Sequence, residues 1–283
     1  MRWQGRRQSS NVEDRRGRGG KGLTVGGGLG AVVALVIYLF FGGDSDKITK
    51  NIPLLQKNET PIERTLSTQD KELGDFASVV LADTEDVWHT IFKKSKRRYR
   101  EPGMVLFSTA TESACGSAQS ATGPFYCPGD EKVYIDLDFF QELQRRLNAP
   151  GDFAMAYVIA HEVGHHVQNL LGIMEQRDRM RDQVSEVEFN RYTVKLELQA
   201  DFLAGVWAHH AQRMKNILEE GDMDEAINAA GAVGDDRIQK RTRGYVVPDS
   251  FTHGTSKQRT RWFLKGWKTG DIKQGNTFDT DDL

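Results

Sequence analysis

Two histidines four residues apart are the residues of this chain best suited to chemistry. They lie in the pentapeptide His161-Glu162-Val163-Gly164-His165. On a helix, residues four apart lie one turn apart on the same face, so both imidazoles can bind one metal ion. Zinc held in this way acidifies a water molecule, and Glu162 is the candidate general base for its attack on a carbonyl carbon. The pattern predicts one zinc ion per chain and a hydrolytic reaction, with a polar helix surface as the alternative.

A catalytic zinc site needs a third protein ligand and keeps one position open. Residues 197–201 begin and end with carboxylates, Glu197 and Asp201, which a helix places one turn apart. We expect Glu197 to bind zinc. We expect Asp201 to accept the outer N–H of His161 and so to fix the tautomer of that ligand.

The sequence offers other candidates for the third ligand besides Glu197. One group of zinc peptidases continues the motif as His-x-x-Gly-x-x-His, but Gln168 and Leu171 occupy the Gly and second His positions here. That arrangement is excluded. Asp182, Glu186 and Glu188 are weaker rivals to Glu197.

Four further histidines have candidate roles. His253 is predicted to lie in a loop between helices, where a histidine can donate a hydrogen bond to the oxyanion of the tetrahedral intermediate. An ordinary loop histidine is the alternative. His166 points about 100° around the helix from its neighbour in the motif, which favours packing over metal binding. The roles of His209 and His210 are left open.

Charge is balanced over the 283 residues, with 38 Lys and Arg against 40 Asp and Glu, but it is unevenly distributed. Residues 1–21 are rich in Arg, Gly and Ser and have few core-forming side chains, which predicts a basic, disordered cytoplasmic tail. A nucleic-acid-binding arm is the alternative. We expect no nucleic-acid partner, because the apolar segment that follows explains the basic residues as a topology signal.

Residues 22–43 form an uncharged, mostly apolar segment. About 20 apolar residues are enough to cross a bilayer as one helix, so the segment predicts a transmembrane signal anchor with the lipid bilayer as partner. Because the basic flank is N-terminal, we expect a single-pass inner-membrane protein with its N-terminus in the cytoplasm and its catalytic domain periplasmic or extracellular. A buried core helix and a cleaved signal peptide are the alternatives.

The remaining chain divides by composition. Residues 44–64 are polar and read as a tether, residues 65–270 as the folded domain, and residues 271–283 as an acidic, flexible tail. Apolar periodicity and helix-capping residues predict helices over 73–92, 138–148, 153–171, 224–232 and 256–269, and a long helix that starts between 185 and 190 and ends at about 214. Ser185 with Glu188 is a candidate capping box for this long helix, and Asn190 is the alternative cap. Strands are predicted at 104–107 and 133–137, so the expected class is α+β, mainly helical, with a small sheet.

The chain has two cysteines, Cys115 and Cys127. In an oxidising compartment, a lone pair of cysteines is most simply a disulfide, here closing a loop-like segment. Two free thiols are the alternative.

The chain resembles the gluzincin metallopeptidases and, more closely, a bacterial family of neutral zinc metallopeptidases. The resemblance covers almost the whole chain and is carried by residues 1–17, the apolar segment, residues 81–88, residues 113–137 with both cysteines, and the motifs at 161–166 and 196–201. It implies a zincin-like fold, and in gluzincins the Glu and Asp of the second helix have the roles given above to Glu197 and Asp201.

The late part of the chain is also similar to the active-site segment of membrane endopeptidases that act on prenylated CAAX proteins. The similarity rests on His253 and Arg259, with Gly254 where that group has proline. It implies that both residues lie at the active site, Arg259 as a substrate or transition-state contact. The family resemblance further implies that residues 133–137 are an edge strand along which a peptide lies extended, with Tyr134 as a candidate contact.

These observations predict a membrane-anchored zinc endopeptidase that hydrolyses peptide bonds of envelope proteins or peptides. The alternative from another class is a zinc-stabilised scaffold of the cell envelope that binds proteins without turnover, because the same ligands would build a structural site.

Overall fold

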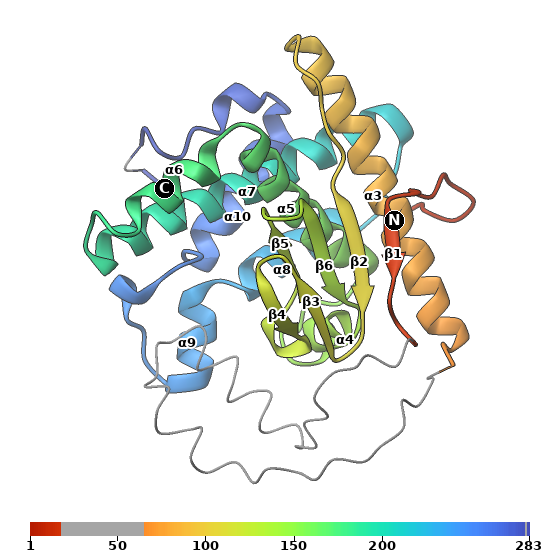
Figure 1. Cartoon of the computed structure of the whole chain (residues 1–283), viewed down its shortest axis with the longest axis horizontal. Helices are drawn as coiled ribbons and strands as arrows, with labels where there is room; N and C mark the ends of the chain where they lie inside the picture. Colours follow the sequence, from red (N-terminus) through yellow and green to blue (C-terminus); the bar gives the residue numbers. More distant parts are fainter. Residues whose placement is uncertain (18–64, 281) are drawn as a thin grey trace, which may run out of the picture.

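The computed structural model describes residues 1–17, 65–280 and 282–283, which form an α+β domain (Figure 1). Helices predominate, and a four-stranded sheet lies among them. The mainly helical α+β class with a small sheet is therefore confirmed.

The sheet has the strand order β1-β2-β6-β5. The strands are β1 (Val12–Asp14), β2 (Gly103–Phe107), β6 (Lys132–Asp136) and β5 (Phe125–Cys127). β1, β2 and β6 are parallel, whereas β5 runs antiparallel to β6. The expectation that residues 133–137 form an edge strand is wrong, because the three-residue strand β5, which the sequence did not reveal, covers the outer side of β6.

The two faces of the sheet bury different side chains. Met104, Leu106, Val133 and Ile135 belong to the main hydrophobic core, which also contains the apolar residues of α5 (Asp152–Leu170). The alternate residues of the same strands, Tyr134 among them, form a separate small cluster. A hairpin of β3 (Ala110–Ser113) and β4 (Gly116–Gln119) lies in front of the sheet in Figure 1. The metal-motif helix and the hairpin therefore belong to opposite faces.

Two long helices begin with capping boxes that are readable in the sequence. α3 (Thr68–Lys94) starts after Ser67, whose side chain pairs reciprocally with Asp70, and α7 (Glu186–Lys215) starts after Ser185 in the same way. The other elements are α4 (Asp138–Arg145), α6 (Ile173–Met180), α8 (Asp222–Ala232), α9 (Asp235–Arg243), α10 (Ser256–Thr269) and the 3₁₀ turns η1 (Ser120–Thr122), η2 (Pro248–Ser250) and η3 (Ile272–Gln274).

Glycines allow α7 and α10 to pack backbone against backbone. A Cβ atom on Gly205 would lie 2.1 Å from the carbonyl oxygen of Phe263, and one on Gly266 would lie 2.0 Å from that of Phe202. Only glycine fits at either position. This close packing holds α10 directly against the helix that carries Glu197 and Asp201.

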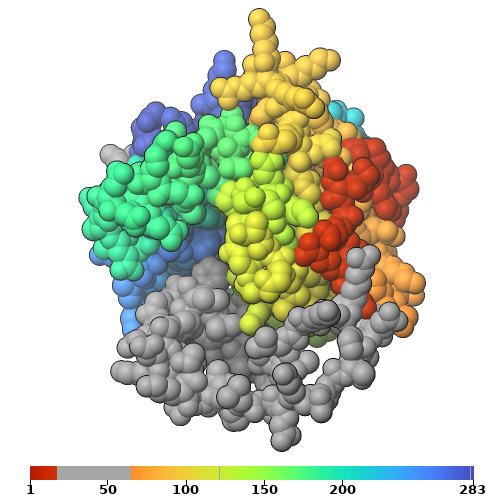
Figure 2. All heavy atoms as spheres, viewed as in Figure 1, coloured from red at the N-terminus to blue at the C-terminus, as the bar shows by residue number. Residues whose placement is uncertain are grey.

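The first seventeen residues pack against the domain (Figure 2), and the expectation of a disordered tail over residues 1–21 is wrong for the described part. β1 extends the sheet beside β2. Arg6 pairs with Asp83 (2.5 Å) and Arg7 with Glu85 (2.9 Å), both on α3. The low apolar content of the segment is offset by these ion pairs to carboxylates that are distant in sequence.

The expected single-pass placement in the membrane is corrected by two findings. Among the described residues, no helix is long and apolar enough to cross a membrane. The expected anchor, residues 22–43, and the tether, residues 44–64, lie outside the described residues. The described residues before that segment belong to the domain as well, because β1 is hydrogen-bonded to β2.

The C-terminal segment is also packed, so the expectation of a flexible tail over residues 271–283 is wrong for its described part. Thr277 is fully buried and donates a hydrogen bond to the carbonyl oxygen of Lys195 on α7 (2.6 Å). The ring of Phe278 lies 4.8 Å from that of Tyr192, also on α7. The domain therefore continues past residue 270.

Candidate metal centre

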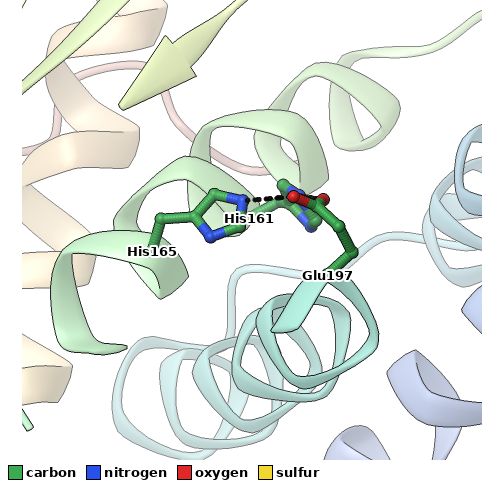
Figure 3. A group of neighbouring side chains, drawn as sticks. All are labelled: His161, His165 and Glu197. Carbon is green, nitrogen blue, oxygen red and sulfur yellow. Dashed lines mark hydrogen bonds and ion pairs between the residues drawn. The ribbon is translucent and has the colours of Figure 1, made fainter. Parts of the chain in front are cut away.

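The structure brings together the three residues predicted to bind metal (Figure 3). His161 and His165 lie one turn apart on α5, with ring centroids 4.8 Å apart. Glu197 projects towards them from α7, and one donor atom from each of the three residues lies within 4.8 Å of the others. Gly164 permits the approach of the two helices, because a Cβ there would already lie 3.1 Å from the carbonyl oxygen of Ala200.

Two of the distances between donor atoms are close to those in a tetrahedral zinc site. Nε2 of His161 lies 3.1 Å from Oε2 of Glu197, and Nε2 of His165 lies 3.4 Å from Oε1. Ligand atoms about 2.1 Å from a tetrahedral zinc are roughly 3.4 Å apart. Two imidazole nitrogens and one carboxylate are also the donor set of many catalytic zinc sites. The residues present therefore fit zinc.

Charge in the group is unevenly shared before a metal binds. Burial alone would raise the pKa of Glu197, but the neighbouring His165, His253 and His161 lower it well below its usual value. Burial alone would lower the pKa of His161, but Asp201 and Glu197 raise it to about 10. The group is thus an anionic carboxylate facing a cationic imidazole, an arrangement in which a dication can replace the proton.

Asp201 lies behind His161, as its spacing from Glu197 suggested. Nδ1–H of His161 donates to Oδ1 of Asp201 (2.9 Å), and the side chain of Asp201 is fully buried. Its pKa is lowered, because Arg259 and His161 together outweigh the effect of burial. Tyr157, one turn before His161, also donates to this carboxylate. Nothing in the sequence singled out Tyr157.

Arg259 is not placed as a substrate contact, and that expectation is corrected. Its Nε donates to Oδ2 of Asp201 (2.8 Å) and its Nη2 to Oδ1 (3.0 Å), a bidentate pair. Arg259 is almost completely buried, and Asp201 is fully buried. The guanidinium neutralises the carboxylate that orients His161.

Gln168 orients the other histidine and was missed as a functional residue. Nδ1–H of His165 donates to Oε1 of Gln168 (2.9 Å), so Nε2 is left for a metal. The spacing of three on one helix was a usable signal. In the sequence, Gln168 served only as evidence against the His-x-x-Gly-x-x-His motif.

The carboxylate of Glu162 has no fixed partner among the described residues. Its side chain is 8% exposed, and within the part of the chain that the structure describes no hydrogen bond or ion pair ties it to another residue. A buried carboxylate without a partner is costly and therefore uncommon. Glu162 directly follows His161 on α5.

His253 lies in the loop between η2 and α10 and interacts electrostatically with Glu197. Asp235, the first residue of α9, builds the loop, because its carboxylate accepts from the backbone N–H groups of Thr252 (2.8 Å), His253 (2.6 Å) and Gly254 (2.9 Å). Burial lowers the pKa of His253, but Glu197 and Asp235 raise it overall. Asp235 was not identified from the sequence.

Tyr134 does not lie at the metal group, and its expected role is corrected. It lies on the sheet face opposite the core that contains α5, stacks on Phe125 and donates to Oδ2 of Asp130 (2.6 Å). Alternation along a strand separates two faces but does not say which one meets the motif helix. Cys115 and Cys127 form the expected disulfide, with Cα atoms 5.8 Å apart.

The remaining histidines contact the protein rather than the metal group. Nδ1 of His166 accepts from the Tyr126 hydroxyl (2.9 Å), while its Nε2–H donates to the carbonyl oxygen of Arg100. His209 and His210 donate to the carbonyl oxygens of residues 267 and 270. These bonds tie strand β5, the loop at Arg100 and the C-terminal end of α10 to the long helices α5 and α7.

Comparison with known proteins agrees with this geometry. The family described as "Putative neutral zinc metallopeptidase" matches residues 1–278. The chain belongs to this family. It is 47% identical to the Escherichia coli protein titled "Uncharacterized protein YpfJ", over 98% of this chain and 99% of that protein. It is 45% identical to an uncharacterized protein of Mycobacterium tuberculosis, over 65% of each chain. No solved structure matches.

Proposed function

We propose that this protein is a zinc-dependent peptidase that cleaves internal peptide bonds of proteins or peptides. The proposal rests on one observation above the others. Two imidazole nitrogens and a carboxylate converge at distances close to those of a tetrahedral zinc site, and Glu162, whose carboxylate has no partner among the described residues, directly follows the first of these histidines. Membership in a family described as zinc metallopeptidases supports it. The proposed substrates are not limited to envelope proteins, because that limit followed from the membrane placement that was corrected above.

Zinc would be held by His161, His165 and Glu197, and when bound it would polarise the scissile carbonyl and acidify the attacking water. Glu162 takes the proton of that water as the oxygen adds to the carbonyl carbon, and then passes it to the nitrogen as the C–N bond breaks. His253 donates a hydrogen bond to the oxyanion of the tetrahedral intermediate. Asp235 holds the loop that carries His253.

The test uses the full chain loaded with zinc and a broad library of peptides read by mass spectrometry. We expect about one zinc per chain. We expect peptide cleavage to fall by about 100- to 10,000-fold in Glu162→Gln, because a general base is lost, while the zinc content is unchanged. Wild-type protein that binds no zinc would contradict the proposal. Equal cleavage by wild type and Glu162→Gln would remove Glu162 from the mechanism, and zinc binding without any cleavage would favour a scaffold.

A further inference from the structure

We propose that the C-terminal strap, defined here as residues 271–280, positions the metal ligand His165 through Gln199 and Gln168. The inference deepens the proposed zinc-dependent function and rests on it. The strap contacts α7 on both sides of Glu197, at Lys195 and at Gln199. The strap therefore packs against α7 on the side of this helix opposite Glu197, the third metal ligand.

A chain of hydrogen bonds connects the strap with the ligand. Nε2–H of Gln199 donates to the carbonyl oxygen of Gly275 in the strap (3.0 Å). Nε2–H of Gln168 donates to Oε1 of Gln199 (3.0 Å), and Nδ1–H of His165 donates to Oε1 of Gln168 (2.9 Å). Gln168 is completely buried and Gln199 nearly so. Because both side chains are buried, water has little access to take the place of either partner in these hydrogen bonds.

Backbone carbonyls determine the direction of every bond in this relay. A carbonyl oxygen can only accept, so Gly275 forces the amide nitrogen of Gln199 towards the strap and its oxygen towards Gln168. The amide nitrogen of Gln168 must then face that oxygen, and it also donates to the carbonyl oxygen of Leu196 (2.7 Å). Its oxygen is left for His165. The relay thus selects the His165 tautomer whose Nε2 has a lone pair for a metal.

The strap is held firmly enough to act as the fixed end of the relay. Thr277 is fully buried and donates to the carbonyl oxygen of Lys195 (2.6 Å). Gly275 lies so close to the ring of Phe202 that a Cβ would approach it to 2.3 Å. The position of the Gly275 carbonyl is therefore set by packing on α7 and by a hydrogen bond two residues away.

The experiment measures zinc affinity by competition with a chromogenic chelator, and the visible absorption of the Co²⁺-loaded protein, on the full chain. Loss of a group that orients a metal-binding histidine typically weakens metal affinity by about 10- to 100-fold, which we expect for Gln168→Leu. We expect Gln199→Leu to weaken zinc binding by roughly 3- to 10-fold, because Gln168 keeps its bond to Leu196. Both variants should change the Co²⁺ spectrum, which a loss of stability alone would not do.

Thr277 and Thr84 provide a matched control. Both are fully buried, and the hydroxyl of each donates to a backbone carbonyl, but Thr84 bonds within α3, away from the relay. Thr277→Val should therefore weaken zinc binding measurably, whereas Thr84→Val should leave it unchanged. If Gln199→Leu does not fold, Gln199→Glu replaces it, because a carboxylate still accepts from Gln168 but cannot donate to Gly275.

The double variant Gln168→Leu/Gln199→Leu decides whether the two amides act as one relay. We expect zinc binding no weaker than in Gln168→Leu alone, since the outer bond can act only through the inner one. Strictly multiplicative effects, or wild-type affinity in both Gln199→Leu and Thr277→Val, would overturn the inference while leaving the proposed function intact. A wild-type protein without zinc affinity would instead overturn both.

Discussion

The two histidines of the metal centre are supported in opposite ways. His161 donates to Asp201, a carboxylate that also binds the guanidinium of Arg259. His165 donates to the neutral side-chain amide of Gln168, which in turn donates to the backbone carbonyl oxygen of Leu196. Both supports are buried and both leave Nε2 facing Glu197. One ligand is therefore held by charge and the other by the geometry of uncharged amides.

The residues that contact the ligand histidines have two roles, which are to orient the imidazole and to adjust its basicity. A carboxylate behind an imidazole makes the ring more basic, and it needs a counter-ion when it is buried. An amide orients the ring without adding charge. Because Arg259 neutralises Asp201 and Gln168 is uncharged, neither support adds net negative charge beside Glu197.

The largest effect should come from breaking the charged support. Asp201→Asn leaves the Arg259 guanidinium buried without its counter-ion, which costs about 3–5 kcal/mol of unfolding free energy. Gln168→Leu is the matched change on the neutral side. It should cost about 1–3 kcal/mol, since it leaves uncharged groups unpaired. Urea unfolding of the metal-free variants measures both.

The double variant Asp201→Asn/Arg259→Met controls for the origin of that cost. Removing both charges should recover most of the lost stability, because no unpaired ion remains. Equal losses in Asp201→Asn and Gln168→Leu, or no recovery in the double variant, would contradict the distinction between the two supports.

The pH dependence of zinc binding should report on the charged support. The pKa of His161 is raised from 6.5 to about 10, since Asp201 and Glu197 outweigh burial. The ring is therefore protonated at pH 7 in the metal-free protein, and zinc must displace that proton. We expect affinity to rise with pH up to about 10, by roughly tenfold per pH unit for each proton displaced. Calorimetry in two buffers of different ionisation enthalpy should show release of at least about one proton per zinc at pH 7.

Asp201→Asn is the control for this measurement. Without the carboxylate the pKa of His161 falls, so fewer protons should be released at pH 7 than in the wild type. A wild-type protein that releases no proton on binding zinc at this pH would show that the imidazole is already neutral.

Spacing along single helices was enough to identify the residues of α5 and α7 that form the metal centre. His161, His165, Glu197 and Asp201 follow from the one-turn periodicity of a helix, and Ser185 from its capping box. Such relations span only a few residues, so no tertiary information is needed to recognise them.

The residues that were missed or misjudged depend on contacts between distant segments. The resemblance to membrane endopeptidases implied a substrate contact for Arg259, and nothing in the sequence shows that α10 brings its guanidinium to Asp201 instead. The role of Gln168 depends on a hydrogen bond from its amide to Gln199 on α7, which the sequence does not show. Arg6 and Arg7 suggested disorder because their partners on α3 lie 77 and 78 residues away. Composition does not reveal that such pairs form.

The most direct test of the metal centre is the X-ray absorption spectrum at the zinc edge of the zinc-loaded wild-type protein. We predict a four-coordinate zinc with nitrogen and oxygen ligands only, at about 2.0–2.1 Å, including two imidazoles. Because His161, His165 and Glu197 supply three donors, the fourth ligand should be water. A sulfur ligand, six oxygen ligands, or a spectrum with no imidazole contribution would contradict the account.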